Sequence, residues 1–290
     1  MKVGVIGLGI MGSAMSANLA KKGFKVCGYD VLPKARAALK RAGGVAADSP
    51  QQVFSSARVI ITSLPSAAAL HSVCASVEGK GAVVIETSTL PIKDKTKAKS
   101  ILAKKGITLL DCPLSGTGAQ AKVGDLVVFA SGDKAAFKKA VPVFKGFSRG
   151  HHYLGEFGNG SKMKFVANLM VAIHNVSAGE AFALGIKAGL KPKDIFEVQA
   201  NSAGSSRMFQ VRGPMMVKGR YDDVTMKNEV WQKDMKIIGA YARSLGVATP
   251  TFNASAGVYK AAMAMGFAKQ DTGAVCAVLE KMSGVRRRRG

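Results

Sequence analysis

Three glycines near the start of the chain, Gly7, Gly9 and Gly12, have the spacing G-x-G-x-x-G. The β-branched run 3–6 predicts a strand before them, and residues 13–22 predict a helix after them. In such a turn the first glycine permits a tight bend, the second lets the backbone approach a pyrophosphate, and the third lets the helix pack closely on the strand. The free N–H groups at the helix N-terminus would face the phosphates. This chemistry is the binding of a dinucleotide.

A carboxylate follows at the expected distance. Asp30 ends a second predicted strand, 24–29, about 20 residues after the glycines, where it can accept a hydrogen bond from a ribose 2′-hydroxyl. Because Asp30 would repel a 2′-phosphate, we expect the cofactor to be NAD, although Lys34 and Arg36 are near enough to leave NADP possible. The residues of this turn predicted to bind the cofactor are Gly7, Leu8, Gly9, Ile10, Met11, Gly12 and Asp30.

The elements that would position these groups alternate between strands and helices over the first half of the chain. Helical segments such as 34–41 and 91–105 separate apolar, β-rich runs, and these runs are 3–6, 25–29, 59–64, 83–86, 108–111 and 126–130. The alternation predicts a doubly wound, mainly parallel sheet of the α/β Rossmann class with right-handed crossovers. The Gly- and Ser-rich stretch 115–124 is predicted to be a long loop.

The second half of the chain has a different character. From residue 161 onward strand signals vanish, so we expect a Rossmann domain over 1–160 and an all-α domain over 161–290. The run 161–188 is apolar on most faces, which favours a long helix buried between domains or subunits, as in a homodimer or homotetramer. Further helices are predicted at 193–200, 228–245 and 251–265.

Cysteine and histidine usage argues against a disulfide framework or a metal site. The four cysteines form no C-x-x-C pair, and two of the four histidines, His151 and His152, are adjacent. The uncharged run 3–20 has only one lysine before it and contains four glycines, and we identify no later hydrophobic span of membrane length. We therefore expect a cytoplasmic protein with reduced thiols, without a metal and without a membrane partner.

The charge is strongly basic: 42 Lys and Arg against 18 Asp and Glu, a formal net charge of +24. Such a field attracts anionic metabolites, nucleotides or nucleic acid. The block 286–289 is expected to be disordered by self-repulsion, as a weak polyanion contact or a solubilising end. We expect any nucleic-acid binding to be weak and non-specific. Many lysines occur singly in amphipathic segments and are expected on a solvated surface, among them Lys34, Lys40, Lys93, Lys95, Lys97, Lys99, Lys104 and Lys105.

Four separated motifs, which together extend over essentially the whole chain, resemble those of the β-hydroxyacid dehydrogenase family. This family includes 3-hydroxyisobutyrate, tartronate semialdehyde and L-threonate dehydrogenases. The motifs are VIGLGIMGSAMSAN at 5–18, DCPLSGTGAQA at 111–121, GNGSKMKFVAN at 158–168, and Lys233-Asp234 within WQKDMKIIGAYA. The resemblance implies a Rossmann domain followed by a helical domain, with the active site in the cleft between them.

The resemblance assigns catalysis to Lys164 and Asn168. Oxidation of an alcohol requires removal of the hydroxyl proton as hydride leaves, and a lysine can accept that proton only if its surroundings favour the neutral amine. Asn168 is four residues further on, hence on the same helix face, and could hold the substrate oxygen or orient Lys164. From periodicity alone Lys164 would be an ordinary surface lysine.

The same resemblance implies the binding residues. Ser115, Gly116 and Thr117 would bind the substrate carboxylate through a hydroxyl and successive N–H groups, although without the family match they are a plain glycine loop. Lys233 would lie against the nicotinamide or the substrate carboxylate; the alternative is a solvated lysine paired with an acid. The remaining residues implied to line the cofactor are Leu64, Pro65 and Thr89.

Departures from the family pattern concern substrate identity. Thr117 stands where the family usually has a second glycine, and Ala167 and Ala69 replace common asparagines. The segment 202–216 is most similar to the threonate-type subgroup. The expected activity is NAD-dependent oxidation of the hydroxyl of a small β-hydroxyacid, 3-hydroxyisobutyrate-like or a C3/C4 sugar acid such as threonate.

Two other functions were weighed against this one. A non-catalytic member of the family that binds nucleic acid or chromatin would account for the charge, but the retained Lys164, Asn168 and Lys233 favour an enzyme. An imine-type reductase would be expected to carry another acid or a tyrosine in place of Lys164.

Overall fold

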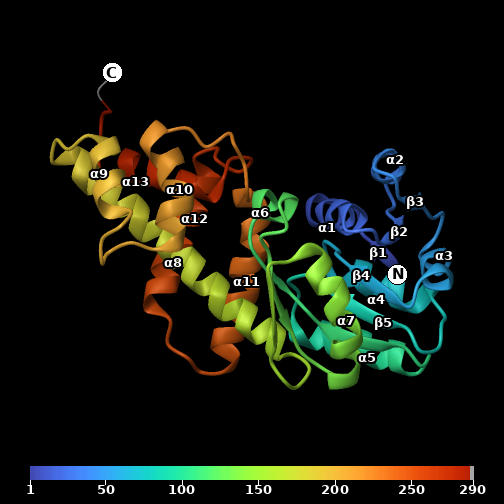
Figure 1. Ribbon diagram of the computed structural model, residues 1–290. Helices are drawn as coiled ribbons and strands as arrows, with labels where there is room; N and C mark the ends of the chain where they lie inside the picture. The colour runs from blue at the N-terminus through green and yellow to red at the C-terminus, as the bar shows by residue number, and fades with distance from the viewer. Residues whose placement is uncertain (288–290) are drawn as a thin grey trace. The chain divides into compact units, whose positions relative to one another are not determined.

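The computed structural model describes residues 1–287 and divides into two compact units, Met1–Lys164 and a second unit from Phe165 onward. The first unit is built on a six-stranded, wholly parallel sheet with the order β3-β2-β1-β4-β5-β6 (Figure 1). The chain winds outward in both directions from β1, so a crevice for ligands is expected beyond the carboxyl ends of β1 and β4. In chain order the strands of this sheet are β1 (Lys2–Ile6), β2 (Lys25–Tyr29), β3 (Val45–Ala46), β4 (Val59–Thr62), β5 (Val83–Glu86) and β6 (Thr108–Asp111).

Both faces of this sheet are covered by helices. On one face Met15 of α1 and Phe144 of α7 pack in one core with Val5 of β1. On the other face Leu70 of α4 and Leu102 of α5 pack in a second core with residues such as Ile60. Burial on both faces accounts for the continuous apolar strands that predicted a parallel sheet. The helices of this unit are α1 (Ile10–Lys21), α2 (Pro33–Arg41), α3 (Pro50–Ser56), α4 (Ala67–Ser76), α5 (Ile92–Ala103), α6 (Gly118–Lys122) and α7 (Lys134–Phe147).

A second, three-stranded sheet follows in the order β7-β8-β9, comprising β7 (Leu114–Ser115), β8 (Val127–Ala130) and β9 (Gly150–Tyr153). The sequence predicted β8 but neither of its neighbours. β7 is only two residues long, and β9 has the sequence GHHY, which contains no alternation of apolar and polar residues.

The prediction of a long loop over 115–124 is wrong. Thr117 begins α6 as its N-cap, because its side chain accepts from the Gln120 backbone N–H while the Gln120 side chain accepts from the Thr117 N–H. This reciprocal capping box satisfies two N–H groups that a short helix would otherwise leave unpaired. The glycines at both ends of the segment are typical of a loop, so the capping box between them was not predicted.

The second unit is helical. The long helix α8 (Asn159–Lys187) begins in the first unit and continues through the second, where the sequence predicted a helix over 161–188. Phe182 of α8 stacks on Phe209, which also stacks on Phe196, in the core of this unit. The remaining elements are α9 (Pro192–Gln199), α10 (Arg207–Lys218), α11 (Asn228–Ser244), α12 (Pro250–Ala264), the 3₁₀ turn η1 (Thr272–Ala274) and α13 (Val275–Met282).

By length and composition alone, α8 could cross a membrane, although the sequence analysis identified no such span after the first residues. Its apolar character is accounted for in part by packing, since Ala178 and Phe182 are buried with Ile195 and Phe209 of the same unit. A core helix is apolar for this reason without a membrane.

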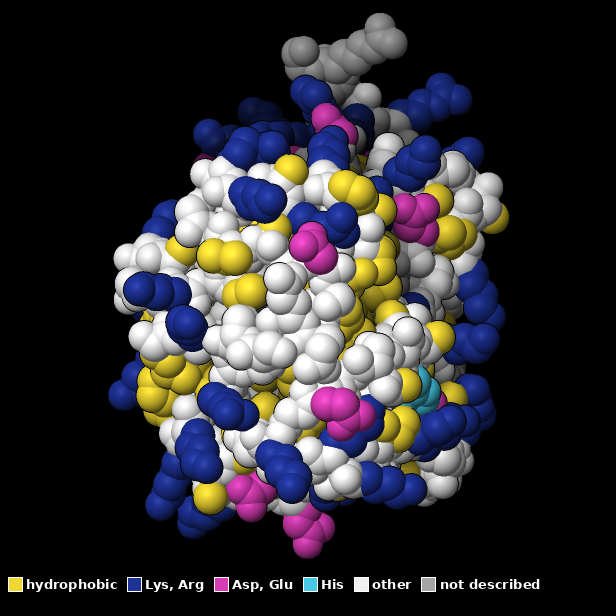
Figure 2. Space-filling model, turned by 90° about the vertical axis from the view of Figure 1, so that its right-hand side faces the viewer, with side chains coloured by type: hydrophobic (Ala, Val, Ile, Leu, Met, Phe, Trp, Pro, Cys, Tyr) yellow, Lys and Arg dark blue, Asp and Glu magenta, His cyan; other side chains and the backbone are white. Residues whose placement is uncertain are grey.

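Basic side chains are dispersed over the face shown in Figure 2, with few acidic side chains among them. The expectation of a solvated surface is nevertheless wrong for two of the lysines. Lys95 is fully buried, because Ala98 and Leu102, three and seven positions further along α5, place it on the core face of the helix. Lys105 is largely buried and donates to the carbonyls of Cys74, Ala75 and Val77 at the end of α4.

The expectation of a disordered arginine block is wrong for Arg287. Its guanidinium pairs with Glu280 and also donates to the carbonyls of Met216 and Val217 at the end of α10. Residues 288–290 lie outside the described part of the chain.

All four cysteines are free thiols. Cys74, Cys112 and Cys276 are buried, and burial raises the pKa of Cys74 to about 12. Within residues 1–287, no three His, Cys, Asp or Glu side chains are grouped as a metal site would require.

Candidate active site

The glycine-rich turn between β1 and α1 has the geometry that its spacing predicts. Gly7 has a φ of +91°, a conformation that side chains rarely adopt, and a Cβ there would overlap the carbonyl of Ser63. A Cβ at Gly12 would overlap Gly7 O, so α1 could not approach the strand as closely. At Gly9, by contrast, a Cβ would meet nothing within 4 Å. The turn is therefore closed toward the protein and open toward the side from which a pyrophosphate would approach.

Asp30 is held against this turn at the end of β2. One carboxylate oxygen accepts from the Leu8 N–H at 2.7 Å, and the other accepts from the Leu32 N–H at 2.9 Å. Each carboxylate oxygen has further acceptor capacity, which suits a ribose hydroxyl. Arg36 donates to the backbone carbonyl of Asp30 at 2.6 Å and lies over the Tyr29 ring, so one cation is fixed close to the acid.

The loops that follow β4 and β5 are joined by hydrogen bonds. The Leu64 N–H donates to Ser88 Oγ at 2.8 Å, and the Ser88 N–H donates to Glu86 Oε1 at 2.9 Å. The exposed Pro65 and the half-buried Thr89 follow in these two loops. The predicted cofactor residues Leu64, Pro65 and Thr89 thus lie at the carboxyl ends of adjacent strands, the edge of an open α/β sheet where ligands bind.

The predicted substrate loop lies between β7 and α6. Ser115 ends β7, Gly116 has a φ of +133°, and Thr117 caps α6. The backbone conformation favours glycine at this position, and a Cβ there would also displace the end of the Leu126 side chain, 2.6 Å away. The hydroxyl of Thr117 lies 3.3 Å from Gln120 Oε1 and accepts from the Gln120 N–H. Its capping contacts define the conformation of this loop.

The start of α8 is fixed within the first unit by three hydrogen bonds to residues far away in the sequence. The Gly160 N–H donates to Ser131 Oγ at 2.9 Å, and Ser161 donates its N–H and its hydroxyl to the Asp111 carboxylate at 2.7 and 2.8 Å. A Cβ at Gly160 would lie 2.6 Å from Asp111 O, so only glycine permits this approach. Lys164 lies one helical turn after Ser161 and is half-buried.

The predicted residues of the helical unit also lie together. Asn168 of α8 donates to Asp234 Oδ2 of α11 at 2.9 Å, and Lys233 Nζ lies 3.1 Å from Asp234 Oδ1. Asp234 is buried, whereas the Lys233 side chain is 39% exposed. This ion pair is the one that the alternative for Lys233 anticipates.

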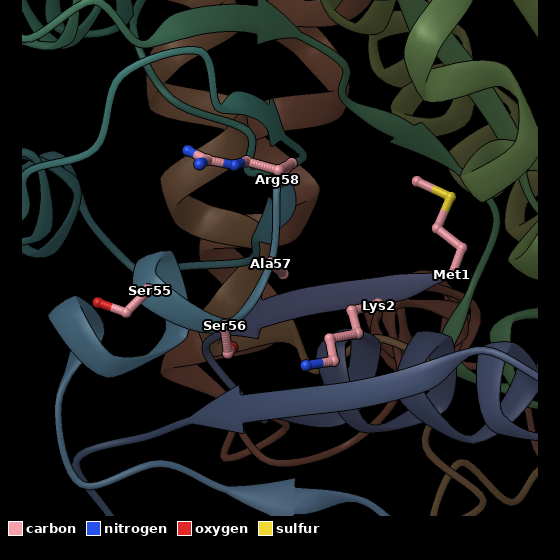
Figure 3. Close-up of a pocket in the computed structure, with 6 residues that line it drawn as sticks. All are labelled: Met1, Lys2, Ser55, Ser56, Ala57 and Arg58. Carbon is pink, nitrogen blue, oxygen red and sulfur yellow. The ribbon is translucent and has the colours of Figure 1, made fainter.

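Two openings of the first unit do not coincide with these residues. A shallow pocket of about 290 Å³ lies where β1 and β4 begin, and Figure 3 shows its lining residues Met1, Lys2, Ser55, Ser56, Ala57 and Arg58. A second opening, of about 710 Å³, is lined by the start of β2 and the end of α1. Both lie at the amino ends of the strands, and ligands of open α/β sheets bind at the carboxyl ends. We therefore assign neither to the active site.

Sequence reasoning missed the residues that support this site. The sequence indicated no role in the site for Ser88, Glu86, Asp111 or Ser161, and it placed Lys95 on the solvated surface. A signal was available for Lys95, because its spacing to Ala98 and Leu102 puts it on the buried face of α5. Nothing in the local sequence connects Lys95 to its partners, which come from β5 and β6.

Fold and site together define a dinucleotide-binding oxidoreductase with a Rossmann unit and a helical unit. Residues 2–155 match the family described as the NAD binding domain of 6-phosphogluconate dehydrogenase. Residues 158–279 match the family described as NAD-binding of NADP-dependent 3-hydroxyisobutyrate dehydrogenase.

Several named proteins are similar to this chain over nearly its whole length. Glyoxylate/succinic semialdehyde reductase 1 of Arabidopsis thaliana is 32% identical, covering 95% of this chain and 97% of its own length. L-threonate dehydrogenase of Cupriavidus necator is 31% identical, covering 94% of each chain. The crystal structure of 3-hydroxyisobutyrate dehydrogenase from Salmonella typhimurium superposes with a TM-score of 0.86 at 27% identity, over 96% of this chain and 99% of that one.

The chain belongs to the β-hydroxyacid dehydrogenase family, and it is an enzyme that uses a nicotinamide dinucleotide, NAD or NADP. The fold expected from the sequence, a Rossmann domain followed by helices, is confirmed. The glycine turn, open only at Gly9, and the Asp30 carboxylate fit such a cofactor.

Proposed function

We propose that this enzyme oxidises the hydroxyl of a small β-hydroxyacid, with Lys164 as general acid/base and NAD as the favoured cofactor. The bound nicotinamide supplies the hydride acceptor. Lys164 Nζ takes the hydroxyl proton during oxidation and returns it when the reaction runs in reverse. This role requires that a substantial fraction of the amine be neutral at the working pH.

The observation that carries the proposal is the anchoring of α8. The N–H groups of Gly160 and Ser161 are bound by Ser131 and by Asp111, which ends β6. Lys164 follows one turn later, on the same unit as the glycine turn and the loops after β4 and β5. A general base must be held within hydrogen-bond reach of the proton that it abstracts, and an anchored first turn supports that requirement.

We propose further that Ser115, Gly116 and Thr117 bind the substrate carboxylate and that Asn168 holds the substrate oxygen or orients Lys164. Support comes from the positive φ of Gly116, since turns with such a residue are found in anion-binding loops. The Asn168 amide donates to Asp234, an arrangement that fixes its rotamer. Lys233, paired with the same carboxylate, would contribute a positive charge toward the cofactor or the acid.

The substrate class follows from size and charge. Relatives of this chain act, by their names, on L-threonate and on glyoxylate or succinic semialdehyde, all short acids or acid aldehydes. The high positive charge of this chain favours anionic substrates in general. We therefore propose a C3 or C4 hydroxyacid, 3-hydroxyisobutyrate-like or a sugar acid such as threonate, in a cytoplasmic homo-oligomer.

The test is reduction of NAD by the purified protein across a panel of C3 and C4 hydroxyacids that includes 3-hydroxyisobutyrate, L-threonate, glycerate and serine. Formation of reduced cofactor is followed spectrophotometrically, with NADP as a parallel series and simple alcohols of equal size as controls. We expect turnover with at least one acid and none with the alcohols. Absence of turnover with every acid and both cofactors would contradict the proposal.

A further inference from the structure

Three ionised side chains are buried together at the carboxyl edge of the large sheet. Glu86 ends β5, Asp111 ends β6, and the two are register partners. Lys95 reaches between them from α5: its Nζ lies 2.6 Å from Glu86 Oε2 and 2.8 Å from Asp111 Oδ1. All three side chains have 0% exposure. Burial lowers the pKa of Lys95, but the carboxylates of Asp111 and Glu86 more than offset this, so its pKa is raised and the ammonium stays charged. We call these residues the buried triad.

Stability alone does not explain such a cluster. Desolvation of buried charges offsets much of their attraction, and well-packed apolar side chains often replace them without loss of stability. The triad also contains two carboxylates for one ammonium, so it carries one excess negative charge. The hydrogen-bond donors that balance this excess negative charge therefore indicate which segments of the chain the triad holds in place.

On the Asp111 side, the triad holds the start of α8. The Asp111 carboxylate accepts from the N–H and the hydroxyl of Ser161, and Ser131, bridged to the Asp111 backbone, accepts from the Gly160 N–H. A carboxylate at a helix N-terminus satisfies otherwise unpaired N–H groups and interacts favourably with the helix dipole. The excess negative charge of the triad therefore faces the positive end of α8.

On the Glu86 side, the triad holds the loops assigned to the cofactor. Glu86 Oε1 accepts from the Ser88 N–H, and Ser88 Oγ in turn accepts from the Leu64 N–H. An unbroken series of polar contacts thus runs from Leu64 through Ser88, the triad and Ser161 to the helical turn that bears Lys164. Each contact in the series is 2.9 Å or shorter.

We propose that the buried triad is a positioning device for the reaction, which fixes the first turn of α8, and with it Lys164, relative to the loops after β4 and β5. The inference rests on the proposed role of Lys164. None of the three triad residues needs to touch the substrate or the cofactor. Because a displacement of about 1 Å between reacting groups can lower a rate about 100-fold, a small shift of α8 would be visible in turnover.

The first test weakens the attachment of α8 to Asp111 and leaves all three triad residues unchanged. Ser161→Ala removes one of the two bonds from Ser161 to Asp111 and keeps the N–H bond, so the protein should fold. We expect kcat to fall about 10-fold, with KM for the best acid of the panel and the Kd of NADH each within about twofold of wild type. Ser177→Ala is the matched control, because Ser177 is on the same helix and donates only to the His174 carbonyl of its own turn.

A double-mutant cycle separates positioning from simple structural support. If Ser161 acts through Lys164, Ser161→Ala should cause no further loss of kcat in the Lys164→Ala background. If Ser161→Ala lowers kcat by the same factor in the wild-type and in the Lys164→Ala backgrounds, the inference is overturned. It is also overturned if Ser161→Ala has the wild-type kcat while Lys164→Ala is inactive. In either case the proposed function stands. Wild-type turnover by Lys164→Ala alone would instead overturn the proposed function and this inference with it.

A second variant extends the test to the carboxylate itself. Asp111→Asn keeps the shape of the side chain but removes the charge that faces α8 and Lys95. We expect a larger loss of kcat than for Ser161→Ala, again with NADH binding retained. A kcat for Asp111→Asn equal to that of wild type would contradict the inference.

Discussion

Within residues 1–287, each unit contains a cluster in which both signs of charge are buried, and the two clusters are built differently. In the sheet unit Lys95 serves two carboxylates, those of Glu86 and Asp111. In the helical unit Arg212 pairs with a single carboxylate, Asp271, at 2.8 Å. That carboxylate also accepts from backbone and hydroxyl groups of Thr225, Met226 and Gly273.

The two clusters also differ in which segments of the chain their hydrogen-bond partners connect. Asp271 is satisfied by Arg212, by the loop before α11 and by Gly273 of its own turn, and although burial raises its pKa, these partners more than compensate, so its pKa is lowered. Its partners join η1 to the loop before α11 and reach no predicted site residue. The triad instead connects residues of the two cofactor loops to the start of α8. The buried charges of the helical unit thus join η1 to the loop before α11, whereas we propose that those of the sheet unit position the start of α8.

The largest effect should come from removing the cation of each cluster. Lys95→Met leaves two adjacent buried carboxylates without a counter-ion, so we expect the free energy of unfolding of the sheet unit to fall by about 3–5 kcal/mol. Arg212→Met should cost less, about 2 kcal/mol, because Asp271 keeps its other donors.

Urea unfolding measures both variants. The single tryptophan, Trp231, is buried in the helical unit, so its fluorescence reports on that unit, while circular dichroism reports on both. Lys97→Met, an exposed lysine of the same helix as Lys95, is the control. A greater loss of stability for Arg212→Met than for Lys95→Met would reverse the comparison between the clusters.

The cofactor preference tests the glycine turn of the sheet unit. Asp30 would repel a 2′-phosphate, so kcat/KM with NAD should exceed that with NADP. Asp30→Ala combined with Val31→Arg should reverse this preference, because a cation replaces the repelling acid and Arg36 is already fixed beside it. Steady-state kinetics with both cofactors measure the ratio, and equal or better use of NADP by the wild type would disprove the assignment of Asp30.

The substrate loop tests binding separately from proton transfer. Ser115→Ala removes one donor to the substrate carboxylate but leaves the backbone N–H groups of the loop in place. We expect KM for the acid to rise about 10-fold with kcat changed by less than about threefold. A loss confined to kcat would show instead that Ser115 acts in the chemical step.

The smallest effect concerns the basic surface. Because the lysines are dispersed, any binding to DNA should be non-specific and should weaken steeply between about 50 and 200 mM salt. Truncation after Arg287 retains its pairing with Glu280 and removes two arginines, which should lower the slope of log K against log salt by about 2. Titration of labelled duplexes of unrelated sequence at several salt concentrations measures this slope. Tight binding of one sequence at physiological salt would favour the nucleic-acid alternative.

The two units also differ in how far the sequence predicts them. The sheet was predicted because each buried strand is a continuous apolar run, and the glycine turn because its three glycines and Asp30 are close in sequence. The short strands β3 and β7 are too brief to leave a periodic signal, and the capping box of α6 was hidden between glycines. Arg287 was predicted to be disordered because it belongs to a run of four arginines; two of its partners, the carbonyls of Met216 and Val217, lie about 70 residues earlier, at the end of α10.

The candidate site was predictable only in part, for a physical reason. Roles for Lys164, Asn168 and Lys233 came from resemblance to a family, since a helical lysine has no local feature that separates catalysis from solvation. For the triad, the local sequence indicates only that Lys95 lies on the buried face of α5; Glu86, Lys95 and Asp111 meet because β5, α5 and β6 are adjacent in the fold.

The most direct test of the account is the turnover of Lys164→Ala with the best acid of the panel. If Lys164 is the general acid/base, kcat falls about 100-fold or more, while the Kd of NADH and the unfolding transition stay at wild-type values. Lys162→Ala is the matched control, because this exposed lysine lies two residues earlier on α8 and donates to Asn159. A Lys164→Ala enzyme that kept more than about a tenth of the wild-type kcat would contradict the central claim.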